Sequence, residues 1–120
     1  MALTPHDFAL IIGAPCQVIS TGSFIIQTEK LIAVDILGQS VFVGGWRYLH
    51  EFEIKPILRP LSSLTEAEEQ ELYRLTFSVW PSYKDSRNYE AKRTRWLLAH
   101  HFCLFPEWFE TGDAIDATTI

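Results

Sequence analysis

The chain has 120 residues, of which 48% are hydrophobic and 21% are charged, and its formal net charge is −5. This composition is too apolar for a disordered chain, and the length suits one core. We therefore expect a single domain over residues 1–120, mainly β over 1–60 and mainly α over 61–120. The net negative charge repels polyanions, which argues against a general polyanion binder.

A short helix is the first predicted element, and it begins at Thr4. Thr4 can cap the helix, Pro5 suits a first position that needs no N–H, and Asp7 complements the positive end of the dipole. Gly13 and then Pro15 end it, because glycine accepts a left-handed closing residue and proline cannot continue the helix.

Short runs rich in Val, Ile and Phe follow, and the pairs Thr21-Gly22, Leu37-Gly38 and Gly44-Gly45 separate them. This spacing is typical of antiparallel strands. It predicts four or five strands, over residues 16–20, 23–28, 31–36, 40–43 and 52–58.

Two features predict how these strands are arranged. Apolar residues occupy consecutive positions at 24–26 and 31–34, as in strands covered on both faces, which favours a sheet curled like a small barrel. Pro56 and Pro60 predict that the last strand lies at an edge, because proline cannot donate to a ladder on both sides.

The second half is predicted to be helical. Thr65 and Glu68 have the spacing of a capping box, and Leu72, Leu75 and Val79 then recur at helical spacing until Trp80-Pro81. A second long helix is predicted from about residue 89, with its apolar face at Tyr89, Trp96, Leu97, His100, Cys103 and Leu104.

A final helical turn is predicted over 106–110, ending at Gly112. The expected fold class is therefore α+β: a short N-terminal helix, a four- or five-stranded antiparallel curled sheet, then two longer helices and a terminal helical turn packed against it.

Two stretches of the chain carry a resemblance: EIKPILRPLSSLT at 53–65, and the end from Trp96 through His101-Phe102 to GDAID at 112–116. Together they resemble a family of small proteins encoded by phages and prophages of Bacteroidetes-type bacteria. Members of that family carry an IKPILRPLSDLT segment, a helix ending in HFD and a GLIEKGLAIDINTL-like tail. The match covers about a third of the chain.

The resemblance implies a phage or prophage setting and brings no assigned activity. This chain departs from the family at Ser63 and Cys103, where aspartate is usual, and at 106–108, where a glycine-led turn is usual. The central motif itself combines apolar residues, two stiffening prolines and a helix cap. We interpret it as a joint between sheet and helices.

Several aromatic residues lie beside turns or helix ends instead of inside periodic runs: Trp46, Tyr48, Trp108 and Phe109, with Trp80 and Tyr83. Partly exposed aromatic residues mark protein-binding surfaces. The alternative is that they join the sheet to the helices. The first functional hypothesis is a non-catalytic phage or prophage accessory protein, an adaptor or inhibitor that binds a host or phage protein through Trp46, Tyr48, Trp108 and Phe109.

Five of the ten basic residues fall within twelve positions, interleaved with Tyr83, Tyr89 and Trp96: Lys84, Arg87, Lys92, Arg93 and Arg95. Such a basic strip can contact phosphates while aromatic rings stack on bases. The alternative is a solvated helix face paired with the acidic run 66–71. The second functional hypothesis is therefore a nucleic-acid-associated module.

A metal site has weaker support. His100 and Cys103 share a helical face, but a structural zinc ion needs four ligands and the other His and Cys residues are scattered, so we expect both in the core. Acidic clusters at 66–71 and 107–116 support a third hypothesis, a small metal-dependent enzyme. Without a nucleophile or phosphate-loop motif, we expect no catalytic residue, cofactor or metal.

The remaining expectations concern the compartment and assembly. Cys16 and Cys103 are too few for a disulfide framework and are predicted to be reduced thiols. No basic stretch precedes an apolar region at the start, and the longest apolar run, 8–16, is about half of a ~20-residue span. We expect a protein of the bacterial cytoplasm, with a homodimer as one candidate assembly.

Overall fold

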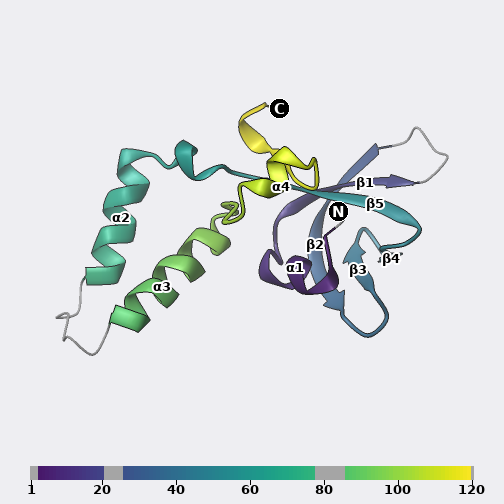
Figure 1. Ribbon diagram of the computed structural model, residues 1–120, viewed down its shortest axis with the longest axis horizontal. Coiled ribbons are helices and arrows are strands. Elements are labelled where there is room, and N and C mark those ends of the chain that lie inside the picture. Colours follow the sequence, from purple (N-terminus) through teal and green to yellow (C-terminus); the bar gives the residue numbers. More distant parts are fainter. Residues whose placement is uncertain (1–2, 21–25, 78–85, 120) are drawn as a thin grey trace.

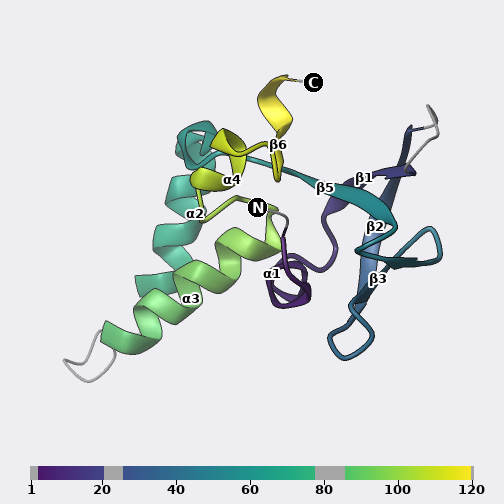
Figure 2. The same cartoon turned by 45° about the vertical axis from the view of Figure 1, so that its right-hand side comes forward.

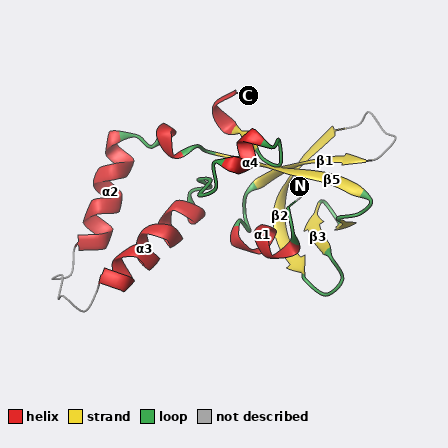
Figure 3. Ribbon diagram, in the orientation of Figure 1, coloured by secondary structure: helices red, strands yellow, loops and turns green. Residues whose placement is uncertain are grey.

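The computed structural model describes residues 3–20, 26–77 and 86–119, and it has the expected α+β class (Figure 1). Figure 3 shows the strands gathered in one half of the molecule and the two longest helices in the other. The predicted Thr21-Gly22 turn, Val79, Trp80-Pro81 and Lys84 lie outside the described residues.

The strands form one open sheet of mixed direction, in the order β4-β3-β2-β1-β5-β6. Every neighbouring pair is antiparallel except β5 and β6, which run parallel. The bounds are β1 Pro15–Ser20, β2 Ile26–Asp35, β3 Ser40–Val43, β4 Trp46–Tyr48, β5 Phe52–Leu58 and β6 Ile115–Asp116.

This sheet differs from the prediction in strand number, closure and direction. It has six strands and is open, instead of four or five in a barrel-like curl. The sequence pattern predicted two strands in place of β2, separated at Glu29-Lys30. These charged side chains are exposed, so one continuous strand accommodates them. It also missed β4, a strand of three residues, and β6, a strand of two.

The predicted edge position of β5 is wrong for the order of the strands, since β5 lies between β1 and β6, although no residue of β5 pairs with both neighbours. This strand pairs with β1 from Phe52 to Pro56 and with β6 at Ile57 and Leu58. Pro56 is the last residue of the ladder with β1, opposite Cys16. The proline therefore lies where β5 changes its neighbour, a position that spares the ladder interior.

The N-terminal helix α1, Pro5–Leu10, is confirmed together with its cap. Thr4 N–H donates to the Asp7 carboxylate at 2.9 Å, and Asp7 N–H donates to the Thr4 hydroxyl at 3.3 Å. Phe8 on this helix enters the main core beneath the sheet, as does Trp108 on the terminal turn α4, Glu107–Glu110. The other buried members of the main core include Cys16, Val18, Leu31, Val41, Val43, Ile54 and Leu58.

The two longer helices, α2 Glu66–Phe77 and α3 Ser86–Ala99, form a hairpin that extends away from the sheet (Figures 1 and 2). They were expected to pack against the sheet. Instead, Leu72, Trp96, Leu97 and Phe102 make a second, smaller core, with Leu64 and Leu104 against it. The Cα radius of gyration of 16.2 Å exceeds the about 14 Å of a compact chain of this length.

The motif at 53–65 connects these two parts. The Arg59 guanidinium donates to both Glu68 carboxylate oxygens at 2.7 Å and lies 4.2 Å from the centre of the Phe102 ring. Thr65 and Glu68 form the predicted capping box, with bonds of 3.1 and 3.2 Å. Arg59 and Thr65 together hold the pKa of Glu68 at about 2, so this carboxylate stays charged.

Candidate functional site

The β3–β4 hairpin presents an exposed aromatic surface. Its turn contains Gly44 and Gly45 at φ +66° and +135°, conformations that favour glycine. In the register that follows, Trp46 lies opposite Phe42 and Tyr48 lies opposite Ser40, so these side chains share one side of the sheet. The Phe42 and Trp46 rings meet edge to face, with centroids 5.4 Å apart. We call Phe42, Trp46 and Tyr48 the aromatic face.

The side chains of the aromatic face differ in their exposure. Trp46 is 55% exposed and Tyr48 is 49% exposed, while Phe42 is half-buried. Tyr48 also contacts the His50 ring, with centroids 5.5 Å apart. Rigid aromatic side chains bind partners with little loss of side-chain entropy.

The opposite side of the hairpin is held to the sheet. Val41 and Val43 are buried in the main core, and Arg47 of β4 lies opposite Val41 in the ladder. The Arg47 guanidinium is 5.0 Å from the centre of the Phe52 ring. It also donates to the backbone carbonyls of Val43 at 3.4 Å and Gly44 at 3.5 Å. These contacts give the aromatic face a rigid support.

The structure does not bring the four predicted protein-binding residues together. Trp46 and Tyr48 lie on β4, whereas Trp108 is only 8% exposed in the main core and packs on Phe105 at 4.9 Å. Phe109 is half-buried against the same core. Phe42, opposite Trp46 on β3, completes the exposed surface instead. Gly44-Gly45 was interpreted as a turn, but no strand was predicted directly after it. The register across that turn would have paired Trp46 with Phe42.

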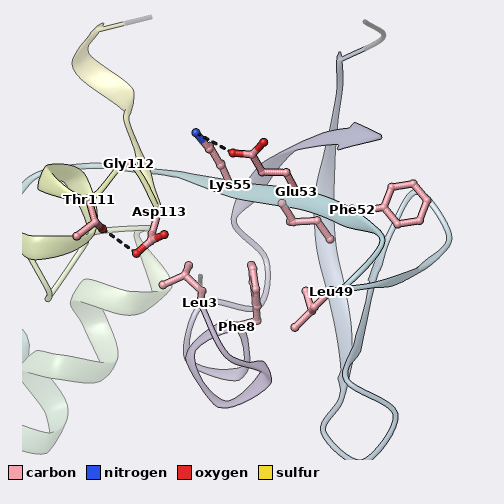
Figure 4. A pocket seen from close by; sticks show the side chains of 10 residues that line it. Leu3, Phe8, Leu49, Phe52, Glu53, Lys55, Thr111, Gly112 and Asp113 are labelled. Carbon is pink, nitrogen blue, oxygen red and sulfur yellow. Dashed lines mark hydrogen bonds and ion pairs between the residues drawn. The ribbon is translucent and has the colours of Figure 1, made fainter. Parts of the chain in front are cut away.

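A pocket of about 240 Å³ lies on the other side of the sheet, between α1, β5 and the segment Thr111–Asp113 (Figure 4). Its apolar lining is Leu3, Phe8, Leu49, Phe52 and Ile54. Its polar groups bond to each other: Lys55 pairs with Glu53 at 3.1 Å, and the Thr111 hydroxyl donates to Asp113 at 2.7 Å.

The basic strip lies on or near α3. Lys84 lies outside the described residues, and Arg87 belongs to the helix. Lys92 and Arg95 are exposed and Arg93 is partly exposed. In the acidic run of α2, Glu68 pairs with Arg59 of the joint and not with the strip.

His100 and Cys103 contribute to different cores. The His100 ring stacks on Trp96 at 3.9 Å, and its Nδ1 lies 2.9 Å from the Trp96 carbonyl oxygen. The buried Cys103 thiol donates to the Phe105 carbonyl at 3.1 Å, and burial raises its pKa. Burial also raises the pKa of the Cys16 thiol to about 12, so neither cysteine has the character of a nucleophile.

His101 lies between the two residues considered for a metal site, and nothing in the sequence indicated its unusual backbone conformation. It has φ +64°, and its ring atom Nδ1 is buried without a hydrogen-bond partner among the described residues. Burial, followed by the charges of Lys30 and His100, lowers the pKa of His101. A positive φ on a histidine has no sequence signal of its own.

Comparisons with protein-family models, curated proteins and solved structures found no match to this chain. Within residues 3–20, 26–77 and 86–119, no three His, Cys, Asp or Glu side chains gather so as to hold a metal ion. Among the helices of the same ranges, none combines the length and apolar character needed to cross a bilayer.

Proposed function

We propose that this chain is a non-catalytic protein-binding module, an adaptor or inhibitor that contacts another protein through the aromatic face. The observation that carries the proposal is the exposure of Trp46 and Tyr48, at 55% and 49%, on a strand at the end of the sheet. Aromatic side chains of this kind dominate binding energy at protein interfaces.

The setting we propose is a phage or prophage protein acting in the bacterial cytoplasm on a host or phage protein. The support for the setting is the resemblance of residues 53–65 and 96–116. Cys16 and Cys103, both free and buried thiols, are compatible with a reducing compartment.

The test is affinity capture of the tagged protein from a phage-infected bacterial host, with and without nuclease. The double variant Trp46→Ala/Tyr48→Ala is compared with Tyr73→Ala, which removes an aromatic side chain that is 66% exposed on α2. We expect one stoichiometric protein that survives nuclease, is lost with the double variant and is retained with Tyr73→Ala. Equal capture by the native protein, the double variant and Tyr73→Ala would refute the proposal.

The basic strip supports a second candidate function, association with nucleic acid. Its support is the exposure of Lys92 and Arg95, which lie three positions apart on α3. Binding of this kind weakens steeply with salt, because displaced counterions determine the slope. Affinity for a single-stranded oligonucleotide that is absent, or insensitive to salt, would remove this candidate.

A further inference from the structure

The backbone of β4 has hydrogen-bonding groups that its own sheet does not use. Val43 N–H donates to Gly45 O at 2.9 Å, and Leu49 N–H donates to Gln39 O at 3.0 Å. In an antiparallel ladder, hydrogen-bonded pairs alternate with pairs that are not. Arg47 is therefore hydrogen-bonded to Val41 across the ladder, and Trp46 and Tyr48 direct their N–H and C=O groups away from β3.

These outward groups lie at the outer edge of the sheet. β4 is the terminal strand of the sheet. At this edge, Tyr48 O accepts a bond of 3.0 Å from Glu51 N–H within the described part of the chain. A carbonyl oxygen has two lone pairs and can accept a second bond. Trp46 and Tyr48 thus offer both an exposed side chain and an open backbone position.

We propose that the partner binds by strand addition: an extended segment of another protein lies antiparallel along β4 and forms main-chain hydrogen bonds with Trp46 and Tyr48. This inference rests on the proposed function and specifies its partner. Main-chain bonds supply affinity in such complexes, and alternate side chains supply specificity.

The side chains of β4 predict the sequence of the added segment. Its residues opposite Trp46 and Tyr48 lie over the aromatic face and are expected to be apolar. The residue between them lies opposite Arg47, on the other side of the sheet. Arg47 has five N–H donors, and the structure shows long bonds of 3.4 and 3.5 Å for two of them. An acidic side chain opposite Arg47 can accept from these donors and pair with the positive charge. The predicted partner segment is therefore apolar–acidic–apolar.

The same geometry disfavours a second copy of this chain as the occupant. Two β4 strands paired antiparallel about Arg47 would place Trp46 beside Tyr48 of the partner, which is favourable. They would also place the two Arg47 side chains directly opposite each other, and like charges in that position are destabilising. An acidic side chain removes this conflict.

The experiment uses the full chain, isotopically labelled, and short capped peptides with Val-Asp-Val at the centre between threonines. Amide exchange is followed by NMR at peptide concentrations up to about 1 mM, which detects weak complexes. We expect slower exchange at the amides of Trp46 and Tyr48 and no change at Arg47, whose N–H already bonds within the sheet. A peptide with Val-Lys-Val should bind about three- to fivefold more weakly, the range of a cross-strand charge pair.

Arg47→Glu should reverse this preference, and Arg47→Gln should remove it. The lysine peptide tests the same contact on the native protein, so the result does not depend on a variant that folds poorly. Methylation of the backbone nitrogens of the two valines should abolish binding, because strand addition needs their N–H groups.

Three outcomes would overturn the proposed complex of β4 with an apolar–acidic–apolar segment. Peptides that shift the aromatic side chains without protecting the Trp46 and Tyr48 amides would refute it and leave the proposed function standing. Protection of these amides without peptide, together with a doubled mass, would identify a second copy as the occupant. Absence of binding by every peptide would refute the predicted segment, whereas the proposed function itself depends on the capture experiment.

Discussion

The sheet and the α2–α3 hairpin bury their apolar side chains on very different scales. Among the described residues, fourteen buried side chains form the main core under the sheet, and four form the core of the hairpin. The hairpin core also depends on Phe102, which follows α3 and packs under Arg59 of the joint. The sheet thus has the stability to support a binding surface, and the hairpin depends on its connection to the sheet.

Polar contacts as well as apolar ones connect the α2–α3 hairpin to the sheet. Beyond the Arg59–Glu68 pair, Arg59 N–H donates to His101 O at 2.8 Å, and Cys103 N–H donates to Arg59 O at 2.8 Å. These bonds place the end of α3 beside the end of β5. The comparison predicts that the hairpin can open locally while the sheet stays folded, because regions with few buried apolar contacts have the lowest local stability.

The largest expected effect comes from the main core. Phe8→Ala should lower the free energy of unfolding by about 3–5 kcal/mol, because it deletes a buried aromatic ring and leaves a cavity. Denaturant unfolding measures this change. Leu37→Ala is the matched control at a fully solvated turn and should change the free energy by less than about 0.5 kcal/mol. Equal effects of the two substitutions would contradict the assignment of the core.

Leu97→Ala in the hairpin core should have a smaller effect on the whole molecule. The local cost of a buried leucine is about 2–5 kcal/mol, but it should fall on the hairpin alone. Hydrogen exchange should show faster exchange over 66–77 and 86–99 with unchanged protection in β1, β2 and β5. If the sheet loses protection equally, the two regions unfold as one unit and the comparison fails.

The two helix caps give a matched pair with a smaller effect. Thr65→Ala and Thr4→Ala each remove a capping hydroxyl, which costs about 1 kcal/mol. Thr65→Ala should loosen the hairpin only, whereas Thr4→Ala should lower the global stability, because α1 belongs to the main core. Global unfolding measured beside hydrogen exchange separates the two results. Indistinguishable profiles would show that the caps do not report on separate regions.

Acid should loosen the hairpin before the sheet. The pKa of Glu68 is lowered from 4.5 to about 2, so its ionised form stabilises the folded state above about pH 4.5, and this contribution is lost as the pH falls toward 2. Hydrogen exchange of α2 at pH 6 and pH 3 measures the loss. Glu68→Gln should show a weaker pH dependence, and an unchanged dependence would exclude Glu68 as its source.

The smallest expected effect on stability is at the aromatic face. Trp46→Ala should change the free energy of unfolding by no more than about 1 kcal/mol, because the side chain is mainly exposed and the substitution removes an edge-to-face contact with Phe42. The same substitution should greatly reduce partner capture. A large loss of stability would show that Trp46 supports the sheet instead of a partner.

Local signals predicted much of this fold. The start of α1 was predicted from Thr4-Pro5, and the start of α2 from Thr65 with Glu68, because capping depends on residues within one turn. β4 and β6 were missed, because strands of three and two residues carry no period. The pairing of β6 depends in addition on the distant strand β5. Trp108 was predicted to lie on a binding surface, but it is buried in the main core. The sequence of a single helical turn does not show its burial, because the tertiary packing around the turn decides it.

Binding through the aromatic face is tested most directly by hydrogen-exchange footprinting of this protein in complex with the partner that capture identifies. We expect slower exchange over residues 42–50, centred on Trp46 and Tyr48, and unchanged exchange over 86–99. Slower exchange confined to 86–99, with β4 unaffected, would refute binding through β4 and assign it to the α2–α3 hairpin.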